Sequence, residues 1–423
     1  MPSDWELGRL GDLTSKPDYG LTASATTERG GPQFLRITDI QDGTVLWPTV
    51  PYCAAGAPDS DRYRLRAGDL VVARIGATTG KAYLVENPPA AVFASYLIRI
   101  RTGPRLLPEF LDQFTKSQAY REQIDAGKGG RLKQGVSIPV LQDLRVPLPP
   151  ISEQRGIANV LRTVQHAKEA TEKVIVATKQ LKQSLLTHLY TSGPTGMRQA
   201  GGQESRESEL GPIPAHWKTA ALGDAVVATQ YGLSQRGEES GQYAILRMTN
   251  LVEGKLDTTA LQYVDLPKAV YEKFSLKKGD LLFNRTNSHE LVGKTSLFDL
   301  DGQFVFASYL IRVSTDRAVL DPEFVNYFLN LDRTQSGLRQ MAMRAVSQSN
   351  INANKLRSVR VPVPPIQEQQ RTAAMLSFVD RKLQAERRQS QLLAVLSQRL
   401  LHHLMTGKVR VHDLPLPEPP GSH

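Results

Sequence analysis

The sequence lacks the features that would stabilise or anchor an exported protein. Its 423 residues include a single cysteine, Cys53, which excludes an internal disulfide and a cluster of thiolate metal ligands. No uninterrupted apolar run reaches the roughly 18 residues of a membrane-spanning helix. Residues 1–5 have neither the basic nor the apolar region of a secretory signal. We therefore expect a soluble, cytoplasmic protein in a reducing compartment.

Catalytic and metal-binding patterns are also missing. Asn87–Ala90 has the Asn-Pro-Pro order of amino-methyltransferases, but Ala90 replaces the aromatic ring that would stack on a flipped-out base. Gly76–Lys81 has three residues between its glycines where a nucleotide-binding P-loop has four. His402 and His403 are adjacent, so they point to different faces of a helix and cannot form an i, i+4 metal pair. We expect no catalytic residue, no metal and no cofactor bound by this chain.

Positive charge is what the sequence has in excess. Lys and Arg total 52 against 42 Asp and Glu, which gives a formal net charge of +10. This surplus favours a polyanionic partner, because Lys and Arg that neutralise phosphates release condensed counterions. A basic protein that is merely soluble is the alternative that charge alone leaves open.

One domain is written twice in the chain. Phe93–Arg99 recurs without change as Phe306–Arg312, and five further blocks recur in the same order, 211 to 215 residues apart. These blocks are Trp5 with Leu10–Asp12 and Trp217 with Leu222–Asp224; Leu35–Ile40 and Leu246–Leu251; Gly68–Leu70 and Gly279–Leu281; Pro108–Phe110 and Pro322–Phe324; Val146–Ile151 and Val361–Ile366. Six blocks in one order indicate a tandem duplication.

Each copy begins with a domain of mixed secondary structure. Short runs of strand-forming residues bounded by Gly, Pro and Asp predict strands at 69–73, 96–100, 281–283 and 309–313. Helical stretches are expected at 108–124 and 322–343, because each opens on a proline in its first turn.

Each copy ends with a long helix. Residues 152–190 and 367–405 are proline-free runs of 39 residues, and Ser152 is expected to cap the first. Its apolar positions have the three-and-four spacing of a coiled-coil seam, at Val160, Val164, Ala167, Thr171, Val174, Thr178, Leu181 and Leu185. The polar stretch 192–214 is expected to be a flexible linker.

Two equivalent helices that pair through equivalent faces are expected to be antiparallel, about a pseudo-twofold axis. Because each domain is joined to the start of its own helix, this pairing would hold the two domains at opposite ends. Two DNA readers held in this way would contact half-sites about 34 Å apart, one turn of the duplex. A plain dimerisation coiled coil is the alternative.

The helix starts carry a family resemblance. Val146–Gln154 and Val361–Gln369 resemble the start of the central and distal helices of type I restriction-modification specificity subunits, and the repeated blocks are similar to their target recognition domains. The resemblance implies that each domain reads one part of a split double-stranded DNA sequence. It also implies that the helices dock two methyltransferase subunits, which carry S-adenosylmethionine, and that motor-nuclease subunits using ATP and Mg²⁺ join them.

The expected fold class is therefore α+β, with two pseudo-symmetric, β-rich target recognition domains separated by two long antiparallel spacer helices that form a coiled coil. The expected division is 1–148 for the first domain, 149–191 for the central helix, 192–214 for the linker, 215–363 for the second domain, 364–406 for the distal helix and 407–423 for the tail.

Three pairs of loops at equivalent positions are polar or basic. The pair 74–81 and 284–289 differs sharply between the copies, as sites that read different bases would. The pair 128–134 and 344–350 precedes the proline-rich segments, and the third pair begins at Tyr19 and Tyr231. With the Leu-Arg-x-Thr blocks, the expected DNA contacts are Tyr19, Arg36, Thr38, Arg74, Thr78, Thr79, Lys81, Lys128, Arg131, Lys133, Gln134, Tyr231, Ser234, Arg247, Thr249, Asn284, Arg285, Thr286, Asn287, Ser288, Lys294, Arg344, Ser347, Gln348 and Asn350. Ser95–Tyr96 and Ser308–Tyr309, identical in both copies, are expected in core strands.

The leading hypothesis is a non-catalytic subunit that binds a bipartite DNA sequence. A nuclease or methyltransferase acting by itself, a protein-binding coiled-coil scaffold, and the reader of a related fused restriction or phage-defence system are the alternatives.

Overall fold

The structure is a computed structural model that describes residues 2–41, 43–54, 61–127, 135–194, 204–287, 291–344 and 349–414; at 287, 343, 344 and 349 only the backbone is described. Two compact units divide the chain. Unit 1 is Met1–Lys173 with Arg387–His423, and unit 2 is Val174–Glu386. Each unit thus combines one β-rich domain with parts of both long helices. The domain boundaries drawn from the sequence stay a prediction.

Unit 1 contains a central antiparallel sheet in the order β2-β11-β8-β9. Its two middle strands, β8 (Leu70–Ala73) and β11 (Leu97–Ile100), are buried along their whole length. Alternate residues point to opposite faces of a strand, so Leu70 and Val72 join one core cluster, whereas Val71 and Ala73 join another. A sheet covered on both faces explains why β8 is a continuous apolar run and why β11 is apolar except for Arg99.

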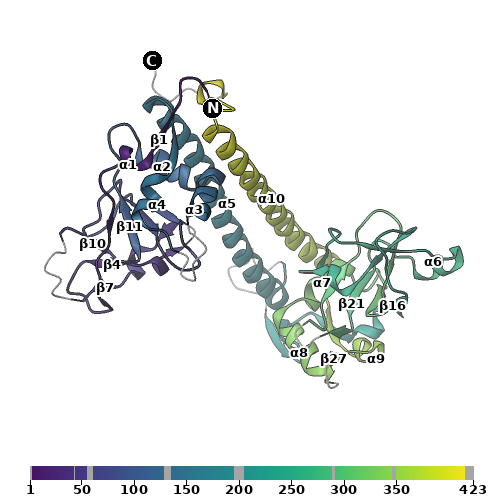
Figure 1. Cartoon of the computed structure of the whole chain (residues 1–423). Coiled ribbons are helices and arrows are strands. Elements are labelled where there is room, and N and C mark those ends of the chain that lie inside the picture. Colours follow the sequence, from purple (N-terminus) through teal and green to yellow (C-terminus); the bar gives the residue numbers. More distant parts are fainter. Residues whose placement is uncertain are drawn as a thin grey trace, which may run out of the picture. The chain divides into compact units, whose positions relative to one another are not determined.

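The remaining elements of unit 1 surround this sheet. The strand β10 pairs in parallel with β4 in a second sheet, ordered β10-β4-β7-β3, and β1 pairs with β12. In Figure 1, α3 and α4 lie between the strands labelled β4, β7, β10 and β11 and the helix α5. The bounds are β1 Glu6–Arg9, α1 Leu10–Leu13, β2 Asp18–Tyr19, β3 Ala25–Thr26, β4 Gln33–Leu35, η1 Ile37–Asp39, β5 Ile40–Gln41, β6 Thr44–Val45, η2 Trp47–Thr49, β7 Tyr52–Cys53, β9 Ala82–Leu84, β10 Ala91–Phe93, α2 Pro108–Thr115, α3 Gln118–Gly127, α4 Ile138–Asp143 and β12 Arg145–Leu148.

Unit 2 repeats this plan. Its sheet β16-β25-β21-β23 corresponds to β2-β11-β8-β9, and β17 pairs in parallel with β24 as β4 does with β10. The bounds are β13 Ser205–Ser208, β14 Gly211–Pro214, β15 Lys218–Ala221, η3 Leu222–Asp224, β16 Val226–Tyr231, β17 Tyr243–Leu246, η4 Met248–Asn250, β18 Leu251–Val252, β19 Lys255–Leu256, β20 Gln262–Val264, α6 Lys268–Phe274, β21 Leu281–Asn284, β22 Thr286–Asn287, β23 Thr295–Leu297, β24 Phe304–Phe306, β25 Leu310–Thr315, α7 Pro322–Leu329, α8 Asp332–Met341, β26 Met343–Arg344, β27 Ser349–Asn350, α9 Ala353–Arg357 and β28 Arg360–Val363.

Two expectations about these elements were wrong. Each helical stretch after the sheet is split in two, into α2 and α3 and into α7 and α8; at the first break the Ser117 hydroxyl accepts the Tyr120 N–H at 3.2 Å. Part of the stretch expected as a flexible linker forms the hairpin of β13 and β14. This hairpin is ordered because Ile213 is fully buried in the core of unit 2.

The long helices are α5 (Ile151–Ser192) and α10 (Ile366–Met405). The carbonyl of Pro150 accepts the N–H groups of Glu153 and Gln154, so the residue at the N-cap position of α5 is Pro150 and not Ser152.

The buried Gln154 side chain ties α5 to its domain, because its oxygen accepts the Leu107 N–H at 2.9 Å and its nitrogen donates to two carbonyls. Gln369 makes the same three bonds in the second copy, which accounts for the repeated Gln at both helix starts.

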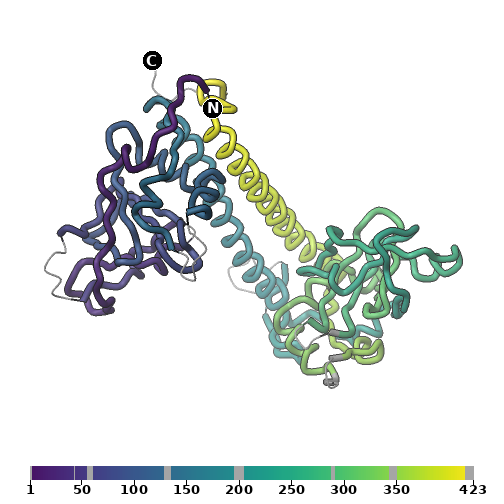
Figure 2. The backbone as a smooth tube through the Cα atoms, in the orientation of Figure 1, coloured from purple at the N-terminus to yellow at the C-terminus, as the bar shows by residue number. Residues whose placement is uncertain are grey.

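Within each unit, the start of one long helix packs in the same core as the end of the other. In unit 1, Ile157 near the start of α5 shares a core cluster with Leu404 near the end of α10, and the colours of Figure 2 show the same pairing. In unit 2, Leu189 near the end of α5 shares a cluster with Ala373 near the start of α10. The predicted α+β class with a repeated domain and antiparallel long helices is confirmed.

The predicted seam on α5 is wrong at three positions, because Ala167 is exposed and Val174 and Leu181 are 39% and 58% exposed. Lys182 occupies the inner face instead, because its ammonium nitrogen lies 2.6 Å from a carboxylate oxygen of the buried Asp380 on α10. Among the described helices, none combines the length and apolar character that a bilayer span needs.

Candidate nucleic-acid interface

The candidate interface of each unit is built around an arginine that follows a buried strand of the central sheet. Arg74 follows β8 and Arg285 follows β21. The guanidinium carbon of each lies 4.7 Å from the centre of a tyrosine ring, Tyr19 in unit 1 and Tyr231 in unit 2. Each guanidinium also donates to the carbonyl of the serine at the turn before β11 or β25, at 3.4 Å and 3.3 Å. We call these the Arg–Tyr pairs; they are the same in both units.

A glycine beside each tyrosine lets two backbone segments touch. A Cβ atom on Gly20 would lie 2.2 Å from the carbonyl oxygen of Ala94, and one on Gly232 would lie 2.3 Å from that of Phe306. No side chain fits at these distances. The glycines therefore fix Tyr19 and Tyr231 against the turn that leads into the next strand.

That turn corrects a prediction, because Ser95–Tyr96 and Ser308–Tyr309 are not core strand. They form turns, and Tyr96 and Tyr309 are 55% and 47% exposed. The carbonyl of each tyrosine accepts the backbone N–H of Arg74 or Arg285 at 3.0 Å. The backbone of each exposed tyrosine is therefore bonded to the arginine of an Arg–Tyr pair.

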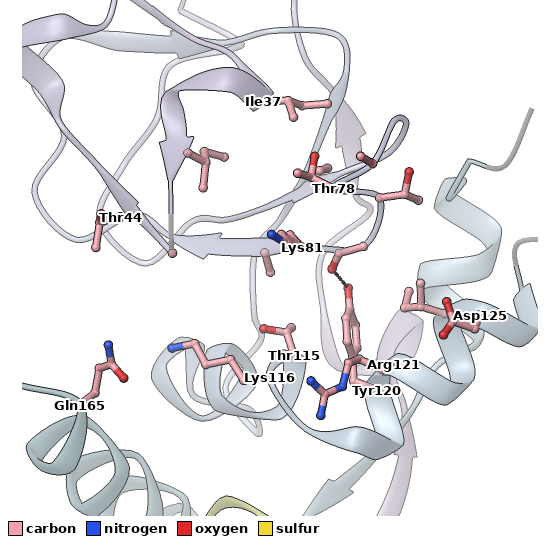
Figure 3. A pocket seen from close by; sticks show the side chains of 18 of the residues that line it. Ile37, Thr44, Thr78, Lys81, Thr115, Lys116, Tyr120, Arg121, Asp125 and Gln165 are labelled. Carbon is pink, nitrogen blue, oxygen red and sulfur yellow. Dashed lines mark hydrogen bonds between the residues drawn. The ribbon is translucent and has the colours of Figure 1, made fainter. Parts of the chain in front are cut away.

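Residues 74–81 in unit 1 and 285–294 in unit 2, which we call the recognition loops, are held at their far ends by a helix. Gly80 and Gly293 have φ values of +87° and +94°, in the left-handed region that favours glycine. The Tyr120 hydroxyl on α3 donates to the Gly80 carbonyl at 2.7 Å, as Figure 3 shows, and the Gln335 amide on α8 donates to the Gly293 carbonyl at 2.9 Å. Burial raises the pKa of Tyr120, so its hydroxyl keeps the proton that it donates.

In unit 1 this loop forms one wall of a cleft of about 1020 Å³. Lys81, Lys116 and Arg121 bring positive charge to it from the loop and from the end of α2 and the start of α3 (Figure 3). Asp125 of α3 also lines it, so the net charge of this wall stays positive. The wall formed by α5 carries Glu169, Glu172 and Lys168, of which Lys168 lies 3.7 Å from Glu172, so its net charge is negative. The charges suit a phosphate at the wall formed by the recognition domain rather than at the helix. Lys116 and Arg121 were missed by the sequence reasoning because the second copy has Asn330 and Gln335 at the matching positions.

The remaining residues predicted to contact DNA differ in how far their side chains are exposed to solvent. Thr38, Lys81, Ser234 and Thr249 are exposed, whereas Thr78, Thr79, Lys294 and Asn350 are half-buried. Asn284 and Thr286 are 1% and 8% exposed, and the Asn284 amide donates to the Leu291 carbonyl at 3.1 Å. Burial makes both side chains inaccessible to a partner, which corrects the prediction for these two residues, and Asn284 instead shapes its loop.

Arg36 and Arg247 are partly used within the fold. The Arg36 guanidinium forms an ion pair with Asp39 at 2.8 Å, and that of Arg247 donates to the Ala260 carbonyl at 3.1 Å. Both residues cap short 3₁₀ helices, which explains why the Leu-Arg-x-Thr-(Asp/Asn) block recurs.

Several predicted contacts cannot be placed. Lys128, Arg131, Lys133, Gln134, Ser288, Ser347 and Gln348 lie outside the described residues. Asn287 and Arg344 are described by their backbone alone, in β22 and β26. Over the ranges that the structure describes, no group of three or more His, Cys, Asp or Glu side chains is arranged to hold a metal ion.

Comparison with known proteins identifies the family. The model of the type I restriction modification DNA specificity domain matches the chain twice, at residues 2–178 and 214–394. The chain belongs to this family. Each match includes one β-rich domain and the greater part of the long helix that follows it. The resemblance drawn from the helix starts and the repeated blocks is therefore confirmed.

Individual members of the family show the extent of the likeness. The MjaVIII type I restriction enzyme specificity subunit of Methanocaldococcus jannaschii is 21% identical over 441 residues, 98% of this chain and 95% of the relative. The MjaX specificity subunit from the same organism is 28% identical over 210 residues, so the match spans about half of either chain (49% of each). The crystal structure of the S subunit from M. genitalium superposes with a TM-score of 0.62 at 15% identity, over 95% of this chain and 96% of that one. At that identity the likeness shows the fold.

Proposed function

We propose that this chain selects the DNA sequence on which a type I restriction-modification complex acts, and that each unit reads one half of a split target. The observation that carries the proposal is the contrast between scaffold and loop. The Arg–Tyr pairs, the close-approach glycines and the turns are the same in both units. The loop residues between them differ, as Gly76–Lys81 does from Thr286–Lys294. Two alike frameworks that present unlike loops suit two different half-sites.

The long helices support a second part of the proposal, the docking of methyltransferase subunits. In unit 1, Leu392, Val395 and Leu396 of α10 are 61%, 50% and 44% exposed. In unit 2, Leu181 of α5 and Phe378 of α10 are 58% and 64% exposed. Leu392, Val395 and Leu396 have the i, i+3, i+4 spacing of one helix face, and contiguous exposed apolar patches are typical of protein interaction surfaces. We propose that these partners bring S-adenosylmethionine, and that motor-nuclease subunits bring ATP and Mg²⁺ chemistry.

An exchange of one recognition domain tests the proposal. Residues 1–145 are replaced, in the complete complex, by those of a relative with a different methylated motif. We expect one half of the methylated sequence to change completely, while the other half and the gap between them stay as they were. Long-read methylation mapping of cells that carry each version measures this directly.

The matched control replaces the second domain and should change the other half only. An unchanged motif after either exchange would contradict the proposal, as would a change in both halves after one exchange. The purified chain by itself should neither methylate nor cleave DNA; activity of the chain alone would favour an enzyme.

A further inference from the structure

Tyr96 and Tyr309 need an explanation that packing does not give. They belong to the block Phe93–Arg99 and its unchanged copy. Phe93, Leu97 and their equivalents are fully buried, so their identity is explained by the core. The two tyrosines are about half exposed. An exposed ring that is the same in both copies, beside loops that differ, indicates a role shared by the two units.

The backbone holds each of these tyrosines in a fixed position. The N–H of Leu97 closes the turn onto the Ala94 carbonyl at 2.9 Å, and that of Leu310 does the same onto Ala307. The carbonyl of each tyrosine accepts the N–H of the arginine of the Arg–Tyr pair. Within the described part of the chain, neither phenol hydroxyl has a hydrogen-bond partner. Each domain thus presents an exposed hydroxyl donor on a turn whose backbone is fixed and whose serine carbonyl accepts the guanidinium of the Arg–Tyr pair.

We infer that Tyr96 and Tyr309 are positioning contacts to the DNA backbone, one in each unit, whose hydroxyls donate to phosphate oxygens at the edge of each half-site. The inference rests on the proposed function. A side chain common to both units cannot distinguish two different half-sites, whereas phosphates are the same in every sequence. The hydroxyl of tyrosine is a common donor to phosphate, and Arg74 and Arg285 add positive charge at the same turn, where they donate to the carbonyls of Ser95 and Ser308.

The test uses the complete methyltransferase complex and two duplexes, one with the mapped target and one without it. The Tyr96→Phe/Tyr309→Phe variant loses only the two hydroxyls. We expect the dissociation constant to rise about fivefold for each lost contact and about 25-fold for both. The loss should be nearly equal on the two duplexes, and the methylated motif should be unchanged. Fluorescence anisotropy at one fixed salt concentration measures the binding.

Tyr96→Ala/Tyr309→Ala should weaken binding at least as much, and Leu46→Ala, which shortens another exposed side chain of unit 1 (66% exposed), should leave it unchanged. Unchanged affinity in the phenylalanine variant would overturn the inference. A loss confined to the target duplex, or an altered methylated motif, would make the tyrosines base readers and overturn it too. Loss of methyltransferase subunits from the complex would assign the rings to a protein contact instead. If the wild-type complex bound both duplexes equally well, that result would contradict the proposed function itself and not only this inference.

Discussion

Asp380→Ala is expected to lower the free energy of unfolding of unit 2 by about 3 kcal/mol or more. Asp380 is 4% exposed and lies on α10 between two partners. Its carboxylate is 2.6 Å from the Lys182 ammonium nitrogen and accepts the Tyr327 hydroxyl at 2.8 Å. Burial raises the pKa of Tyr327, so this hydroxyl stays a donor. Without the carboxylate, a largely buried lysine loses its counter-ion. Hydrogen exchange of the full chain, resolved by peptide, measures the two units separately.

A surface ion pair of the same unit is the matched control. Lys278 lies 2.6 Å from Asp301, but the Asp301 side chain is 92% exposed. Asp301→Ala should change the free energy by less than about 1 kcal/mol, because exposed ion pairs contribute little. If the two aspartate variants proved equally stable, the buried pair would not have the role that we assign to it. The double change Lys182→Met/Asp380→Leu should recover much of the loss, since it leaves no unpaired charge.

Gly20→Ala is expected to destabilise unit 1 by about 3 kcal/mol and to weaken DNA binding with it. The added Cβ would meet the carbonyl oxygens of Phe93 and Ala94 at 2.4 Å and 2.2 Å. Both are backbone atoms in or next to β10, so neither can swing aside as a flexible side chain would. The strand that carries Tyr19 must move, and the Arg–Tyr pair must open. Urea unfolding and duplex binding of the assembled complex measure the two effects.

Gly30→Ala provides the comparison in the same unit. A Cβ at Gly30 meets nothing within 4 Å, and the backbone there is not in the left-handed region. This substitution should be neutral or stabilise slightly, because alanine reduces the freedom of the unfolded chain. Equal effects of the two alanines would show that the close approach at Gly20 is not a constraint.

The position of Tyr96 could not be predicted from the sequence. The block Phe93–Arg99 predicted a strand, and β11 is there, but Tyr96 was assigned to it rather than to the turn before it. The alternation of apolar residues does not mark where a turn ends. The turn is set by contact with Gly20, about 75 residues earlier in the chain.

The predicted inner face of α5 was wrong for a related reason. Leu181 was assigned to the inner face because it is apolar, yet Lys182 takes that place. The charge of Asp380, almost 200 residues further along, makes an inward lysine favourable. In the same way, Tyr120 and Gln335 anchor equivalent loops with different side chains, so no sequence comparison marks them as equivalent.

The sequence by itself determined that one domain is written twice, that each copy ends in a long helix and that the chain belongs with DNA specificity subunits. Repeated blocks and helical spacing are local properties, so they can be read residue by residue. The tertiary structure decided which side chains reach the surface. It buried Asn284, exposed Tyr96 and Tyr309 and turned Lys182 inward. Exposure depends on contacts between segments far apart in the chain, and the order of residues alone does not contain those contacts.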